Sequence, residues 1–144
     1  MKKLAEYAVC ALLGATGYGA LELAVRGRTH WSMALLAGVV MPVLSLIMQR
    51  PPRSPFLLCA LGAAVITAFE FAAGMIVNVA LGWQVWSYAG LPLNYKGQIC
   101  AQYAAAWSVL CLPAFALCRA VHRSFRAGRG RRRRPSVPPP AADR

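Results

Sequence analysis

Four long apolar stretches dominate the chain and limit the folds that are open to it. They cover residues 4–25, 31–48, 56–81 and 98–121. The length of each stretch is close to or greater than that of a membrane-spanning helix, which needs about 20 residues to cross about 30 Å of hydrocarbon. Inside a bilayer every backbone polar group must be bonded internally, which favours helices. The sequence therefore predicts an all-α polytopic membrane protein whose transmembrane domain of four helices covers residues 1–121. Residues 122–144 are expected to form a disordered, Arg- and Pro-rich cytoplasmic tail.

The first stretch also resembles a secretory signal peptide, because Lys2 and Lys3 precede an apolar run. Two acidic residues, Glu6 and Glu22, interrupt that run, and a clean cleavage site of small residues is missing. We therefore expect the first helix to be retained.

The distribution of Lys and Arg predicts the orientation. If the N-terminus is cytoplasmic, that side holds two residues before the first stretch, two between the second and third, and nine from Arg119 onward, thirteen in all. The opposite side then holds three, which are Arg26, Arg28 and Lys96. Since short cytoplasmic segments carry the excess of positive charge, both termini are expected to be cytoplasmic.

The five cysteines all fall within the predicted helices. Cys100 and Cys111 would share a helix face but lie about 16 Å apart along the axis, which is too far for one metal ion. We expect the cysteines to pack as small hydrophobic residues without disulfides. The sequence predicts no metal site and no cofactor.

Glu70 lies well inside the third apolar stretch, about 21 Å from its start. A carboxylate at membrane depth is costly, so we expect it to face the helix bundle and to accept hydrogen bonds. The candidate donors are Asn78, Gln98, Gln102 and Tyr103. Two interpretations stay open, a functional site linked to protons or cations and a hydrogen-bonded anchor between helices.

Glu22 lies one helical turn before Arg26, so an ion pair between them is expected near the outer interface. The segment around Glu22, Ala-Leu-Glu-Leu-Ala, is similar to Ala-Phe-Glu-Phe-Ala around Glu70. Chance similarity between two apolar helices is the alternative to an internal repeat. If the repeat is real, Glu22 and Glu70 are expected to line one polar pocket.

The segment 82–97 is the one connection long enough to have a structure of its own. Its four Trp and Tyr residues suit an aromatic belt at the membrane surface. Such a belt requires none of Pro92, Asn94 or Gly97, which are typical of defined turns. We therefore expect an ordered cap that contains Trp86 and Tyr88.

The cap and the helix after it contain Trp86-Ser-Tyr, Pro92-x-Asn94, Gly97-Gln-Ile-Cys100 and then Trp107. This pattern resembles a signature of small bacterial membrane proteins, the family of putative type IV ABC transporter permeases. In that family it runs Trp-Asp-Tyr-Ser, Pro-x-Asn, Gly-Arg/Gln-Ile-Cys-Leu, then Trp. Ser87 replaces the acidic residue and Ala101 replaces Leu. The resemblance implies a transport-related subunit of the bacterial inner membrane.

The chain contains no Gly-x-x-x-x-Gly-Lys-Ser/Thr phosphate loop, so an ATPase would have to be a separate chain. His30 and His122 fall on opposite sides of the membrane, and no nucleophilic constellation is visible, so we expect no enzyme. The alternative to transport is a non-transporting scaffold or regulatory subunit. Either function implies a homo-oligomer or another membrane subunit. The candidate binding residues are Glu22, Glu70, Trp86, Tyr88, Asn94, Gln98 and Gln102.

Arginines crowd the segment after the last apolar stretch. Basic clusters directly cytoplasmic of a helix are typical of binding to anionic lipids. Nucleic acid is the alternative, but no aromatic stacking residues or folded binding module accompany the arginines, so no nucleic-acid partner is expected. The predicted lipid-binding residues are Arg123, Arg126, Arg129, Arg131, Arg132, Arg133 and Arg134.

Overall fold

The computed structural model describes residues 2–131. Its elements, in chain order, are α1 (Lys2–Arg26), α2 (Trp31–Gln49), α3 (Pro55–Gly74), the π-helix η1 (Met75–Ala80), β1 (Asn94–Tyr95), β2 (Ile99–Cys100) and α4 (Ala101–Arg131). Four helical spans are long and apolar enough to cross a membrane, with α3 and η1 forming one of them. The predicted all-α, four-helix membrane fold is confirmed.

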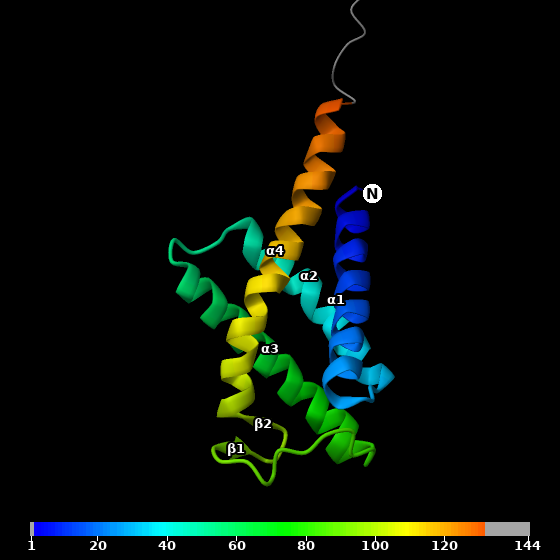
Figure 1. Ribbon diagram of the computed structural model, residues 1–144, viewed down its shortest axis with the longest axis vertical. Helices are drawn as coiled ribbons and strands as arrows, with labels where there is room; N and C mark the ends of the chain where they lie inside the picture. The colour runs from blue at the N-terminus through cyan, green and yellow to red at the C-terminus, as the bar shows by residue number, and fades with distance from the viewer. Residues whose placement is uncertain (1, 132–144) are drawn as a thin grey trace, which may run out of the picture.

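The helices pack mainly as two hairpins, α1 with α2 and α3 with α4, and α2 also contacts α4. Figure 1 shows that α1 begins and α4 ends at the same end of the bundle, which we call the terminal end. The segment between η1 and α4, with the antiparallel pair β1 and β2, covers the opposite end, which we call the loop end.

Local sequence explains where the helices begin and end. The Ser54 hydroxyl accepts a hydrogen bond from the backbone N–H of Leu57, and Pro55 occupies the first turn of α3, where its missing N–H costs nothing. His30 caps α2 by accepting from the backbone N–H of Ser32. Gly27 follows α1 with a φ of +67°, a conformation that terminates helices and favours glycine.

Two of the predicted helix boundaries differ from the structure at α4. The helix starts at Ala101 rather than at residue 98 because Ile99–Cys100 form β2. It continues ten residues beyond the predicted end at residue 121, because arginine has a high helix propensity and extends the helix after the apolar stretch stops. Arg123, Arg126, Arg129 and Arg131 therefore belong to a helix rather than to a disordered tail. Arg132, Arg133 and Arg134 lie outside the described residues.

Small residues allow close approach within both hairpins. A Cβ atom added to Gly14 would lie 2.6 Å from the carbonyl oxygen of Ala37, and one added to Gly62 would lie 2.6 Å from the Cys111 sulfur. Membrane helices pack closely at such positions because small side chains let the backbones approach. Gly14 and Gly62 thereby fix the α1–α2 and α3–α4 contacts.

The apolar core lies between α2, α3 and α4, and its buried members are Val40, Met41, Leu44, Leu58, Cys111, Phe115 and Cys118. All five cysteines are free, as predicted, and four of them are buried. Many large apolar side chains on the outside of the bundle are exposed, including Leu12, Leu35, Phe56 and Val109. Such a surface suits lipid contact, because soluble monomers rarely expose large apolar patches.

Candidate binding site around Glu70

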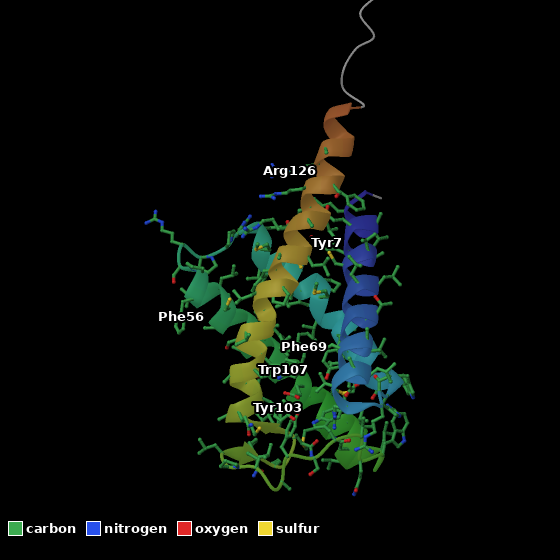
Figure 2. The ribbon with its side chains drawn as sticks, in the orientation of Figure 1. Tyr7, Phe56, Phe69, Tyr103, Trp107 and Arg126 are labelled. Atoms are coloured by element: carbon green, nitrogen blue, oxygen red, sulfur yellow. The ribbon has the colours of Figure 1, made fainter. Side chains whose placement is uncertain are left out.

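Glu70 of α3 is fully buried, with 1% of its surface exposed. The Tyr88 hydroxyl donates to its Oε1 at 2.7 Å, and the indole Nε1–H of Trp107 donates to its Oε2 at 2.9 Å. Figure 2 shows Trp107 on α4, one turn from Tyr103. The inward orientation of Glu70 is confirmed. The predicted donors were wrong, because Tyr88 comes from the cap and Trp107 from the second turn of α4.

Tyr88 is held in place by its backbone and by its ring. Its N–H donates to the carbonyl oxygen of Gly97 at 2.8 Å, and its ring stacks on Tyr103 at a centroid distance of 4.5 Å. Burial, followed by the negative charge of Glu70, raises the pKa of Tyr88 far above its usual value. The phenol therefore keeps its proton and remains a hydrogen-bond donor.

Asn78, one of the predicted donors, organises the cap instead. Its Oδ1 accepts from the N–H of Val85 at 2.7 Å, and its Nδ2 donates to the carbonyl oxygen of Trp86 at 3.0 Å and to Gln98 Oε1 at 2.8 Å. Asn78 lies in the π-helical turn η1, which changes the direction of side chains relative to an α-helix. Asn78 and Gln98 thus bond each other rather than Glu70.

The cap is ordered, as predicted. Trp86 is buried, and its Nε1 donates to the carbonyl oxygen of Gln98 at 3.1 Å. Asn94 donates to the carbonyl oxygen of Leu91 at 2.7 Å and accepts from the N–H of Gly97 at 3.1 Å. Gly97 has a φ of +67°, which its missing side chain permits. These bonds hold Tyr88 in the cap, where its hydroxyl reaches the Glu70 carboxylate.

Glu22 has a different environment from Glu70. Its carboxylate accepts from Arg26 Nη1 at 2.9 Å, as predicted, and also from Thr29 Oγ1 at 2.7 Å. These contacts tie the end of α1 to the turn that follows it. The structure does not bring Gln102 to the site either, because that residue is exposed on α4.

A cavity of about 370 Å³ lies between the four helices, and we call it the central cavity. Apolar side chains make up most of its wall, and the rings of Tyr18 and Trp107 contribute to it with their centroids 6.1 Å apart. Among the described residues that line it, Glu70 is the one charged residue, and Glu22 is absent. The central cavity is therefore not the pocket shared by Glu22 and Glu70 that an internal repeat would predict.

The Glu70 carboxylate is buried but has more acceptor positions than its two donors use. A carboxylate offers about four acceptor positions, and Tyr88 and Trp107 each use one. A ligand group in the central cavity would reach the remaining positions only after the surrounding side chains move slightly.

A second polar cluster at the terminal end was missed by the sequence analysis. Nδ1 of His122 in α4 forms an ion-pair contact with the carboxylate of Glu6 in α1. His122 Nε2 lies 3.2 Å from Oγ of Ser45 in α2, and Ser45 is fully buried. The available signal was that Glu6 and His122 lie at the same end of antiparallel first and fourth helices.

The fold and the buried carboxylate define a multi-pass membrane protein with an intramembrane polar site. A family model described as "Putative ABC-transporter type IV" matches residues 17–130, which include α2, α3, the cap and nearly all of α4. The chain belongs to this family, as the motif resemblance indicated. No curated protein and no solved structure matches the chain significantly.

Proposed function

We propose that the protein is a transport-related membrane subunit that works with a separate ATPase chain and binds its ligand in the central cavity. Family membership and four apolar helices support a role in membrane transport. The sequence has no phosphate loop of its own, which supports a division of labour between chains. We propose no enzymatic activity for this chain.

The observation that carries this proposal is the central cavity with Glu70 in its wall. A volume of about 370 Å³ lies within the range of small-molecule sites. The apolar wall favours a largely apolar ligand, and the free acceptor positions of Glu70 favour one that carries an amine or another donor. Glu70 then has two roles, anchoring Tyr88 and Trp107 and orienting the ligand.

We further propose the bacterial inner membrane as the location, with both termini cytoplasmic. The charge distribution supports this orientation, and the shared position of the start of α1 and the end of α4 is compatible with it (Figure 1). The arginines beyond Arg126 would hold the terminal end at anionic lipids.

A matched pair of glycine variants tests the cavity. A Cβ atom added to Gly17 or to Gly19 would meet nothing within 4 Å, and of the two positions Gly17 lines the cavity. Gly17→Leu should fill the cavity, and Gly19→Leu should leave it open. The readout is quenching of Trp107 fluorescence by a brominated alkylamine. The Trp107→Phe variant measures the fluorescence of the other three tryptophans, which is subtracted.

Quenching in the wild type and Gly19→Leu, but not in Gly17→Leu, is the expected result. Equal quenching in all three would contradict the cavity as the ligand site. A brominated alcohol of the same chain length tests whether the amine matters. Purification with an ATPase chain whose hydrolysis the ligand stimulates would support transport.

A scaffold is the second candidate, favoured by a shallow groove on the outside of α3 and α4. Its wall contains small residues such as Ala60, Ala64 and Ala105, which let a membrane helix approach closely. The Thr67 hydroxyl beside it is buried without a partner among the described residues. A stable complex without ligand-stimulated hydrolysis would favour this alternative.

A further inference from the structure

A second cavity, of about 480 Å³, lies at the terminal end, and we call it the terminal cavity. Its wall comes from the start of α1, the end of α2 and the last part of α4. Figure 2 shows Tyr7 and Arg126, two of its lining residues, on neighbouring helices at this end. It is separate from the central cavity, which lies among the membrane-spanning parts of the helices.

Four positive side chains line the terminal cavity. Arg119, Arg123 and Arg126 follow one another at spacings of four and three residues, so they share one face of α4. Lys3 of α1 adds a fourth positive charge. The α4 face and the start of α1 thus direct four cations toward one concave surface.

The one carboxylate in this wall is already engaged. Glu6 is buried and pairs with His122, which also contacts Ser45. Among the described residues the ion pairs are this one and Glu22–Arg26. Within that part of the chain the four cations therefore have no acidic partner.

We propose that the terminal cavity is a binding site for a phosphate group. Guanidinium groups match phosphate oxygens in charge and in the geometry of paired hydrogen bonds, and a concave wall of low dielectric strengthens their joint field. Basic pockets between membrane helices are suited to lipid headgroups. Met48 and Phe125 add apolar wall, which fits a phosphate joined to an organic group. This site goes beyond the transport function and does not depend on it.

The test measures binding by titration calorimetry of the full-length protein in a neutral detergent. The titrants are dihexanoyl phosphatidylglycerol, inorganic phosphate and, as a zwitterionic control, dihexanoyl phosphatidylcholine. The site variant is Arg119→Gln with Arg123→Gln. The matched control is Arg50→Gln with Arg53→Gln, which removes equal charge from exposed residues outside the cavity lining, in the α2–α3 turn.

The site variant should bind phosphatidylglycerol about 30-fold more weakly than the wild type, since each basic group near an anionic headgroup contributes about fivefold. The control should change affinity less than about threefold. Binding of the lipid alone identifies a headgroup site, and binding of inorganic phosphate as well identifies a site for the phosphate group itself. Either result supports the proposal.

Equal losses in the two double variants would overturn the proposal, because the attraction would then come from the general positive surface. The absence of binding to the wild type by either anionic titrant would also overturn it. Circular dichroism verifies that each variant is folded. If the double variant does not fold, Lys3→Gln and Arg126→Gln, each at an exposed position, replace it in the same titrations.

Discussion

Trp107 and Glu70 lie 37 positions apart in the sequence, yet the indole Nε1 of Trp107 lies 2.9 Å from Oε2 of Glu70. This bond joins α3 to α4 in the membrane. Tyr88 adds a second donor from the cap, so one buried carboxylate connects two helices and the loop between them. The cost of burying the carboxylate is offset only where donors of this kind surround it.

Substitutions at Glu70 separate its anchoring role from its charge. In Glu70→Gln the amide oxygen can accept from Trp107, and the amide N–H can donate to the Tyr88 hydroxyl, so we expect nearly unchanged stability. In Glu70→Ala both donors lose their acceptor, and each buried orphan costs about 1–3 kcal/mol. Thermal unfolding in detergent measures the difference.

The same two variants test function. If the charge of Glu70 binds ligand, Glu70→Gln folds normally and loses the amine-dependent quenching of Trp107. Normal quenching by Glu70→Gln would show that Glu70 is only an anchor. A Glu70→Ala protein as stable as the wild type would contradict the anchoring role.

Hydropathy predicted the four spans because the length of an apolar run fixes whether it can cross a bilayer. It also predicted the inward orientation of Glu70, since the cost of a lipid-exposed carboxylate excludes the alternative. The donors could not be predicted, because the π-helical turn at Asn78 and the fold of the cap decide which side chain reaches the carboxylate. Hydropathy likewise gave no signal for a helix that continues through arginines to Arg131.

The raised pKa of Tyr88 predicts a stability change at alkaline pH. The unfolded phenol releases its proton near pH 10, whereas the folded phenol keeps it. The unfolded state then binds fewer protons, so the contribution of Tyr88 is fully present below about pH 10 and is lost as pH rises toward the folded pKa. The free energy of unfolding should therefore fall more steeply above about pH 10 in the wild type than in Tyr88→Phe. Parallel curves would contradict this prediction.

Gly62 should be intolerant of a larger residue. A Cβ atom there would lie 2.6 Å from the Cys111 sulfur and 3.1 Å from the Phe115 ring, so Gly62→Ala must displace these side chains or the helices that carry them. Overpacking of this kind costs about 1–3 kcal/mol. Gly17→Ala is the matched control, because its added methyl group meets nothing within 4 Å. Equal thermal stabilities of the two variants would show that the α3–α4 contact is looser than described.

The proposed orientation predicts an alternating pattern of reporter fusions. Fusions at Arg28 and Ala89 should report the outside, and fusions at Arg53 and Asp143 should report the cytoplasm, because positive charge concentrates in the latter segments. A reporter active only in the periplasm, paired with one active only in the cytoplasm, reads each position twice. A periplasmic signal from the Asp143 fusion would contradict a cytoplasmic C-terminus.

Glu6 and His122 should be energetically coupled, because their contact joins α1 to α4. A double-mutant cycle of Glu6→Gln and His122→Gln isolates the pair from the separate cost of each change. We expect a coupling free energy of about 0.5–3 kcal/mol, the range for residues in direct contact. The control cycle combines Glu22→Gln with His122→Gln. Since Glu22 bonds Arg26 and Thr29 elsewhere, those changes should add to within about 0.5 kcal/mol. Additive effects in the Glu6–His122 cycle would show that this contact does not hold the terminal end together.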